Sequence, residues 1–494
     1  MSKMDLSTPT RQSIKGLVFI FLQTVRQAVR MFWALIAVVI LQKNLVEYKT
    51  LLPIAVVVIF VLFVVHSVLY YLNFYFYVKD GEFILQKGYL RKKVLTIPLE
   101  RIQSVNTKQN LIQQVLDVVA LEIDTAGTVG KELKIHALEK SFANALHDQL
   151  SNNAVSSEAE ENIESRATST TERLILKLEP IDLLKIGISQ NHLRTGLIIL
   201  AFGYQIFNQV QEIFKDKADE YSNEFVNFMS NSSLALIVFL GIFFLLVSIL
   251  ISLLRTLVKY FDFKLMKKEN AYRVEAGIIN KRNVVLPHNK IQELNWETGP
   301  IKKQFGIYAL VFKQAVSGQN KKVQLVDAPG CLTQHLELLK NDLFGEDKLS
   351  SASKIFTNSY YFRRLWLFMG WLPVVLAAPF IYFEWLIGLA ALVWLLATAA
   401  YSYLILKKSY FKINEDQIRV SSGAISHTWK QMELFKIQSV EFKQTFFQKR
   451  RSLASLKLMN ASGTIRIPYI HQDLAKQIYN YLLFHTEISN KSWM

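Results

Sequence analysis

Three clusters of Lys and Arg are the side chains of this sequence best suited to bind a ligand. They are Arg91-Lys92-Lys93, Lys281-Arg282 and Lys449-Arg450-Arg451. Guanidinium and ammonium groups bind phosphate and carboxylate oxygens, and each base near an anionic membrane surface contributes about 1 kcal/mol to binding. The clusters are therefore candidate sites for an anionic lipid headgroup or a protein partner. The alternative is that they only orient the chain in a membrane and keep its domains soluble.

The motifs that usually mark an enzyme are missing from the sequence. It has no glycine-rich phosphate loop followed by Lys-Ser or Lys-Thr, and no His-Glu-x-x-His. Cys331 is the only cysteine, so no intrachain disulfide can form. His66 lies within an apolar segment, where an ionisable group is a candidate functional residue, although a packed histidine fits as well. We expect no catalytic residue, cofactor, metal or enzymatic activity.

The elements that position the clusters belong to a unit that occurs three times. Gly88, Gly277 and Gly423 each stand 15 residues before a glutamine that follows an isoleucine. The pairs are Ile102-Gln103, Ile291-Gln292 and Ile437-Gln438, and in the same register follow Ala120-Leu121, Ala309-Leu310 and Ser455-Leu456. A fixed internal period indicates a repeat architecture. We therefore expect three copies of one module, an apolar hairpin followed by a small polar domain.

Six apolar segments are candidate membrane spans, because a spanning helix needs roughly 20 largely apolar residues. They are Ala28–Val46, Leu51–Leu72, Leu193–Phe214, Leu234–Val258, Trp366–Phe383 and Leu386–Leu406. Arg26 and Arg30 interrupt the apolar sequence between Gly16–Leu22 and Met31–Leu41, so an amphipathic stretch at the membrane interface is interpreted as leading into the first span. Pro373 and Pro379 predict kinks in the fifth segment.

The net charge of +17 is unevenly distributed along the chain. The hairpin loop Gln211–Ser233 carries only two bases and the loop around Glu384 carries none, whereas Lys and Arg flank the opposite ends of the spans. Excess Lys and Arg in short loops marks the cytoplasmic side. Both termini and all three polar domains should therefore face the cytosol of a bacterial cell. We expect no nucleic-acid ligand, because the sequence contains no nucleic-acid-binding motif.

Each polar part is typical of short antiparallel strands closed by one helix. In the first copy, strand-like runs occur at Tyr75–Val78, Glu82–Lys87, Lys92–Ile97, Arg101–Thr107, Val118–Thr125 and Glu132–Ala137. Leu138–Leu150 then has apolar residues at helical spacing, as do Leu332–Phe344 and Gln472–Phe484 in the other copies. The repeated glycines should have positive φ, and the repeated isoleucines should face the core.

The repeat resembles the membrane-flanking type of bacterial pleckstrin-homology (PH) domain protein. That family's Pro-x-x-Arg-Ile-Gln pattern is similar to Pro98-Leu99-Glu100-Arg101-Ile102-Gln103, Pro287-His288-Asn289-Lys290-Ile291-Gln292 and Glu433-Leu434-Phe435-Lys436-Ile437-Gln438. Its later glycine is kept at Gly306 and replaced by Asp117 and Ser452. The resemblance implies a multi-pass membrane protein with six transmembrane helices in three hairpins and three α+β domains. Each domain would have two orthogonal antiparallel sheets and a C-terminal helix.

The expected domain limits follow from the repeat and the resemblance. Residues 16–72, 193–258 and 365–406 are the three hairpins, residues 73–150, 259–345 and 407–486 are the three PH-like domains, and residues 151–173 are a flexible acidic linker.

The resemblance implies a non-catalytic scaffold in the bacterial cytoplasmic membrane. It would bind membrane lipids, a protein partner such as a shorter single-domain relative, or a second copy of itself, and serve the cell envelope or tolerance of membrane-active agents. An alternative is a lipid or peptide exporter that uses the six-helix bundle as its path.

Overall fold

The computed structural model describes residues 8–41, 51–125, 133–146, 172–213, 234–315, 325–381 and 385–488. The chain forms two compact units. Unit 1 contains Met1–Arg173, Met266–Pro287 and Val316–Lys322, and unit 2 contains Leu174–Leu265, His288–Ala315 and Val323–Met494. Three sequence predictions concern segments outside the described residues: the acidic linker except its last two residues, the loop around Glu384, and nearly all of the loop Gln211–Ser233.

Unit 1 contains the first hairpin, the first polar domain and the first strands of the second domain. Its elements are β1 (Thr10–Arg11), α1 (Lys15–Leu41), α2 (Leu51–Leu72), β2 (Tyr75–Lys79), β3 (Glu82–Lys87), β4 (Lys93–Pro98), η2 (Leu99–Arg101), β5 (Ile102–Gln109), α3 (Leu111–Val115), β6 (Val118–Thr125), β7 (Leu133–Glu139), β10 (Ala271–Ala276) and β11 (Lys281–Pro287). Strands β8 (Arg173–Lys177) and β9 (Lys264–Lys268) contain the boundary between the units.

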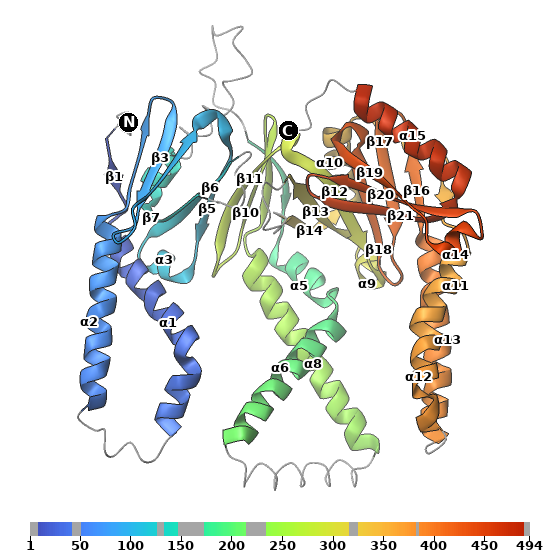
Figure 1. The fold of residues 1–494 in the computed structure, drawn as a ribbon, viewed down its shortest axis with the longest axis horizontal. Coiled ribbons are helices and arrows are strands. Elements are labelled where there is room, and N and C mark those ends of the chain that lie inside the picture. Colours follow the sequence, from blue (N-terminus) through green and yellow to red (C-terminus); the bar gives the residue numbers. More distant parts are fainter. Residues whose placement is uncertain are drawn as a thin grey trace. The chain divides into compact units, whose positions relative to one another are not determined.

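The first domain has the two sheets and the closing helix that the sequence predicts. One sheet has the order β1-β2-β3-β4, and in the other β7, β6 and β5 are neighbours. The two sheets enclose an apolar core that includes Phe76, Phe83 and Leu121, and the helical residues 140–146 contribute Ala143 and Leu146 to it. The helices α1 and α2 extend from one end of this domain (Figure 1).

Unit 2 contains the rest of the chain. Its helices are α5 (Pro180–Ile188), α6 (His192–Ile213), α8 (Leu234–Tyr260), α9 (Pro300–Gln304), α10 (Thr333–Phe344), α11 (Tyr360–Trp366), α12 (Leu372–Ile381), α13 (Trp385–Lys408), α14 (Phe446–Lys449) and α15 (Gln472–Ile488). Its strands are β12 (Ile291–Thr298), β13 (Ile307–Gln314), β14 (Leu325–Leu332), β15 (Ile355–Phe356), β16 (Tyr410–Ile413), β17 (Gln417–Ser422), β18 (His427–Glu433), β19 (Ile437–Lys443), β20 (Leu453–Asn460) and β21 (Gly463–His471).

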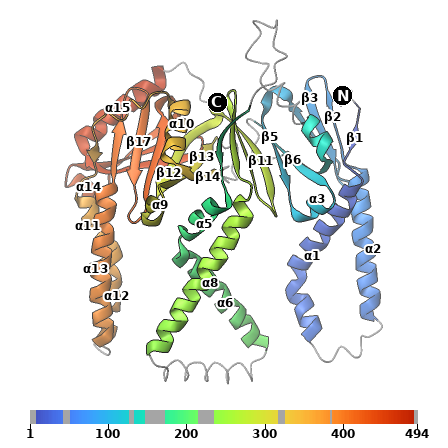
Figure 2. The ribbon, with the colours of Figure 1, turned by 180° about the vertical axis from the view of Figure 1, so that it is seen from behind.

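The third domain repeats the plan of the first. Strands β16–β18 lie in one sheet and β19–β21 form another, and α15 packs against β19, β20 and β21 (Figure 1; α15 is seen from behind in Figure 2). Its core includes Phe411, Met432 and Leu456, with Ala475 and Leu482 contributed by the helix. The prediction of PH-like sheets closed by a C-terminal helix is therefore confirmed.

Successive modules are joined edge to edge through their sheets. In unit 1, β5 of the first module pairs antiparallel with β11 of the second. In unit 2, β12 of the second module pairs in the same manner with β18 of the third, within a sheet of order β14-β13-β12-β18-β17-β16-β15. The strands of the second module are therefore divided between the two units, because each half is bonded to a different neighbour.

The repeated dipeptides mark irregularities in the sheets. Ile102, Ile291 and Ile437 are buried, as expected. The pairing register shifts just after each isoleucine, so the repeated glutamine is the extra residue of a β-bulge. A second shift falls at Ala120, Ala309 and Ser455. The repeated glycines have φ between 96° and 122°, which confirms the turn prediction.

The prediction of six transmembrane helices is wrong. Among the described residues, two helical segments have the length and apolar character to cross a membrane, Gly241–Tyr260 and Leu386–Lys408. Val57–Leu72 is apolar but shorter. The segments α1 and α6 are helical, but α1 carries Arg26 and Arg30 and α6 carries several amide side chains. Their polar composition therefore distinguishes them from the two apolar helices.

The first arm of the third hairpin shows why apolar length alone overestimates spans. The segment is divided into α11, a π-helical stretch at Leu367–Trp371 (η5), and the ten-residue α12. Gly370 permits this stretch, because a Cβ there would lie 2.8 Å from Thr398 Oγ1. The indole nitrogen of Trp394 donates to the Met369 carbonyl at 2.9 Å, which satisfies a group that the irregular backbone exposes.

Candidate functional site

The candidate site begins with the polar face of the sheet formed by β5, β6 and β7. Alternate residues of a strand point to opposite faces. Leu121, Ile123 and Ile135 point into the domain core, whereas their neighbours on the strands point away from it. Three cross-strand pairs therefore line the polar face: Asn106 with Glu122, Lys108 with Ala120, and Glu122 with Lys134.

Glu122 lies at the centre of this face between two lysines. Its side chain is only 3% exposed and accepts ion-paired hydrogen bonds from Lys108 and Lys134. Burial by itself raises the pKa of Glu122, but the hydrogen bonds and charges of the two lysines outweigh it and hold the pKa below its usual value. The carboxylate therefore fixes two ammonium groups on the sheet while leaving each about half exposed.

Helix α1 covers one side of this face. The ring of Phe19 stacks on His136 with 6.2 Å between centroids, and Gly16 lies so close to β7 that a Cβ would be 2.8 Å from the Ala137 Cβ. Burial lowers the pKa of His136 to about 4, with a further contribution from the charges of Lys134 and Lys87. His136 is therefore neutral at pH 7 and serves as a packing surface for the helix.

Strand β11 closes the other side. Its pairing with β5 sets Lys281 opposite Gln109 and Arg282 opposite Lys108. The side-chain amide of Gln114, on α3, donates to the carbonyls of Ile278 and Ile279 at 2.8 and 3.0 Å, which fixes the turn before β11. Two bases of the second module are thereby brought beside the lysines of the first.

Residues of α1, β5, α3, β6, β7 and β11 line a cavity of about 440 Å³, which we call the basic pocket. That volume suits a small polar headgroup. It is lined by Phe19, Gln23, Arg26, Lys108, Gln109, Asn110, Ile112, Gln113, Ala120, Lys134, His136, Asn280, Lys281 and Arg282.

The charge of the basic pocket is its distinctive property. Among the described residues, five bases line it and no carboxylate does, so this lining stays strongly positive even when the nearby Glu122 is included. Within the described part of the chain, Arg26 and Lys281 have no ion-pair partner. The amides of Gln109 and Gln113 bond to the carbonyls of Val118 and His136 and shape the wall. The arrangement can hold an anion by charge-assisted hydrogen bonds.

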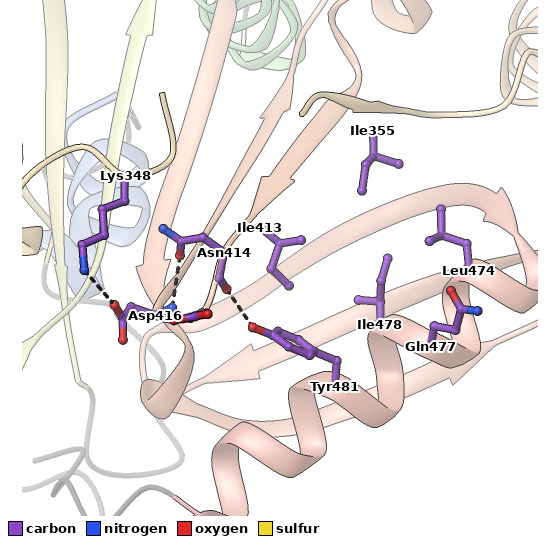
Figure 3. A pocket seen from close by; sticks show the side chains of 10 residues that line it. Lys348, Ile355, Ile413, Asn414, Asp416, Leu474, Gln477, Ile478 and Tyr481 are labelled. Carbon is purple, nitrogen blue, oxygen red and sulfur yellow. Dashed lines mark hydrogen bonds and ion pairs between the residues drawn. The ribbon is translucent and has the colours of Figure 1, made fainter. Parts of the chain in front are cut away.

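A second cavity, of about 550 Å³, lies in unit 2 and has the opposite character (Figure 3). Its floor is apolar, and its rim contains Glu415, Asp416 and one base, Lys348. Tyr481 donates to the Asn414 carbonyl at 3.3 Å, and burial together with the two carboxylates raises the pKa of its hydroxyl. This cavity therefore disfavours an anion.

The structure separates the three basic clusters predicted from the sequence. Only Lys281-Arg282 lines the basic pocket. Arg91, Lys92 and Lys93 are exposed at the turn into β4, beside α2, where the hydroxyl of Tyr89 lies 3.1 Å from His66 Nδ1.

The third cluster, Lys449-Arg450-Arg451, is exposed at the end of α14, next to two exposed aromatic rings. Phe446 is 69% exposed and Phe447 is 65% exposed. Arg451 lies over the ring of Tyr360, the first residue of α11, at 4.2 Å from its centroid. Basic and apolar side chains together at the start of a hairpin are typical of a membrane interface.

Sequence reasoning missed Arg26, Lys108 and Lys134. Lys108 and Lys134 are signalled by the period-two alternation of β5 and β7, which puts them on the face away from the core. Nothing in the sequence indicates that β11 of the next module would join that face.

The fold and the repeat define a class of protein, and the comparison with known families agrees. The Bacterial PH domain family matches residues 18–154, 232–331 and 367–484, so the chain belongs to this family and carries its domain three times. The chain is similar to the UPF0699 transmembrane protein YdbT of Bacillus subtilis (strain 168), with 26% identity over 427 residues, covering 82% of this chain and 83% of YdbT. With two apolar helices long enough to cross a membrane among its described residues, the chain is a membrane-associated PH-domain protein.

Proposed function

We propose that this protein is a non-catalytic, membrane-anchored scaffold whose basic pocket binds the phosphate of an anionic lipid headgroup. The observation that carries the proposal is the convergence of five bases from α1, β5, β7 and β11 on one cavity that has no carboxylate among its described lining residues. Interfacial bases attract anionic lipid at about 1 kcal/mol each, and enclosure in a pocket adds directed hydrogen bonds.

The position of the pocket suits a ligand that arrives from a membrane. Phe19, Gln23 and Arg26 come from the amphipathic start of α1, just before its apolar stretch Met31–Leu41. Helices of this kind lie at the boundary between headgroups and acyl chains. A phospholipid could therefore keep its chains in the bilayer while its phosphate enters the basic pocket.

The PH-like domains are placed on the cytosolic side of the bacterial cytoplasmic membrane in this proposal. The support is the Lys and Arg at the domain ends of the hairpins, including Lys407 and Lys408 at the end of α13. The exporter alternative depended on a bundle of six transmembrane helices, and that prediction is wrong.

The test uses the full chain purified in a neutral detergent. Dioctanoyl phosphatidylglycerol is titrated while protein thermal stability is recorded, with dioctanoyl phosphatidylcholine and inorganic phosphate as separate arms. We expect saturable stabilisation by phosphatidylglycerol alone, weaker at high salt because ions screen exposed charges. Lys281→Ala and Arg26→Gln should each weaken the apparent affinity about five-fold, since each removes one base without breaking an ion pair.

The matched control is Lys476→Ala, which removes an exposed base of α15 in unit 2 and should leave the titration unchanged. Equal stabilisation by phosphatidylcholine, or equal weakening by the control, would contradict the proposal. Stabilisation by inorganic phosphate at the same concentration would mean that the pocket takes a free anion and not a lipid.

A further inference from the structure

The two sheet junctions inside the chain have the same register. Lys108 and Glu297 each lie 20 residues after the repeat glycine of their module, and Arg282 and Thr428 each lie five residues after theirs. In unit 1, Lys108 is paired with Arg282. In unit 2, Glu297 is paired with Thr428. The junction is therefore a property of the module and is repeated faithfully at both places where one module follows another.

Among the described strands, two at junction positions of the module lack a partner strand of this kind. Strand β4 is the last strand of the sheet β1-β2-β3-β4, and β19 is the first strand of the sheet β19-β20-β21. In the part of the chain that the structure describes, each has a single neighbouring strand. In the repeat, β4 corresponds to β11 and β18, and β19 corresponds to β5 and β12. Those four strands are paired with one another in the internal junctions, β11 with β5 and β18 with β12.

Other segments of the chain contact three of the remaining edge strands, β7, β21 and β14. The amide of Ser13 donates to the Ala137 carbonyl of β7 at 3.0 Å, and the amide of Asn358 donates to the Tyr469 carbonyl of β21 at 2.7 Å. Strand β14 contacts α5 and α10. An open strand edge is a ready template for pairing, and proteins usually block one with charges, proline or a covering segment. Strand β4 carries Val94, Leu95 and Thr96 in its middle, with no charge among them.

The two open edges are complementary in the register of the internal junctions. That register sets Val94 opposite Phe442 and Thr96 opposite Val440. The corresponding pair in unit 2 is Trp296 with Trp429, whose rings stack at 6.0 Å. Val94 is 58% exposed and Phe442 is half-buried, so pairing would remove apolar surface from water.

Side chains on β4 and β19 are exposed at positions that are buried on the paired strands of the internal junctions. Thr96 is exposed, whereas Gln431, at the same position of the joined strand β18, is 1% exposed. Gln438 on β19 is exposed, whereas Gln292 on the joined strand β12 is also 1% exposed.

We propose that β4 of one copy pairs antiparallel with β19 of a second copy of this chain, with Lys93 opposite Lys443. The occupant is a second copy because the chain carries both halves of a junction that it already makes twice. The facing lysines have a precedent in Lys108 opposite Arg282. Since the two surfaces differ, the association is head-to-tail and generates chains of copies or closed rings.

The test is disulfide cross-linking in native membranes that contain two differently tagged full-length chains, one with Lys93→Cys and the other with Lys443→Cys. Both lysines are exposed at strand ends, and Cα atoms directly opposite on antiparallel strands lie within disulfide reach. The native Cys331 is buried, so cross-linking of a chain without added cysteines measures the background. We expect a mild oxidant to produce a dimer that carries both tags.

The matched control replaces Lys93→Cys by Lys79→Cys, an equally exposed lysine at the end of β2, and should give no dual-tag dimer. In chains without the added cysteines, Val94→Lys should reduce self-association, measured by light scattering, at least ten-fold. Val94→Thr should not reduce it, because a charge blocks a strand edge and a threonine does not.

Three outcomes would overturn the proposal. One is a dual-tag dimer that is as abundant with Lys79→Cys as with Lys93→Cys. A second is an internal cross-link in a Lys93→Cys/Lys443→Cys chain without any dual-tag dimer, which would mean that one chain closes on itself. A third is a cross-link of Lys93→Cys to a different protein only. Because none of these readouts depends on lipid titration, the result is independent of the headgroup proposal.

Discussion

At the residue scale, one repeat position has kept its backbone conformation after its glycine was replaced. Gly306 has φ of 66°, and the equivalent Asp117 and Ser452 have φ of 53° and 50°. The left-handed region costs a non-glycine residue roughly 1 kcal/mol. The short turn between the small helix and the next strand therefore imposes this conformation, and two of the three copies carry its strain.

Ser452→Gly should stabilise unit 2 by roughly 0.5–1 kcal/mol, because glycine adopts positive φ without the steric cost. The measurement is hydrogen exchange at β20 in the detergent-solubilised full chain, where slower exchange is expected. The reciprocal change, Gly306→Ser, should destabilise by a similar amount. Faster exchange in Ser452→Gly would show that the serine side chain contributes more than the strain costs.

His136 gives a pH dependence whose sign follows from its environment. Burial first, and then the charges of Lys134 and Lys87, lower its pKa to about 4. The unfolded chain binds a proton near pH 6.5, so stability is full above that value and is lost as the pH falls toward 4. One proton corresponds to about 1.4 kcal/mol per pH unit.

His136→Gln should therefore flatten the loss of hydrogen-exchange protection at β7 between pH 6.5 and 4. Burial also lowers the pKa of His427 in unit 2 to about 4. Protection of the sheet that contains His427 should therefore still fall with pH in the variant, which makes it the internal control. An unchanged slope at β7 in the variant would refute this assignment.

At the element scale, the contact between α1 and β7 determines whether the basic pocket exists. Phe19 and Ile20 are buried. Gly16 packs so closely on β7 that a Cβ added at this position would lie only 2.8 Å from the Ala137 Cβ. Arg26 reaches the cavity only because the start of α1 is held there.

Gly16→Val should displace α1 and weaken phosphatidylglycerol binding about ten-fold, by moving Arg26 and opening the pocket to water. Gly241→Val is the matched control in α8, since nothing lies within 4 Å of its added Cβ. The comparison is made by the same lipid titration in detergent. Equal binding by Gly16→Val and the unmodified chain would show that α1 does not contribute to the site.

The polar domains could be predicted from the sequence largely correctly, and the membrane helices could not. Strand alternation and turn glycines are local signals, so the predicted Glu82–Lys87 and Val118–Thr125 match β3 and β6. The repeated glutamines were visible, but their role as bulge residues depends on strand pairing. The π-helical stretch at Leu367–Trp371 lies before both prolines that predicted a kink, at a place where Gly370 packs closely against Thr398.

At the scale of the whole molecule, the sheet junctions explain why three sequence modules become two compact units. Strands β10 and β11 belong to unit 1 through β5, and β12 to β14 belong to unit 2 through β18. The basic pocket is a product of the first junction, because Lys281 and Arg282 of the second module complete a site built on the first. Each cluster alone was predictable, but long-range strand pairing assembles the site.

Photo-cross-linking from inside the basic pocket would identify the molecule that occupies it. Benzoylphenylalanine replaces Gln23, which lines the cavity from α1, in the full chain within native membranes, and the adduct is identified by mass spectrometry. The account predicts an anionic phospholipid adduct that is lost with Lys281→Glu and kept with Lys476→Glu. An adduct with zwitterionic lipid in proportion to its abundance, unaffected by Lys281→Glu, would contradict it.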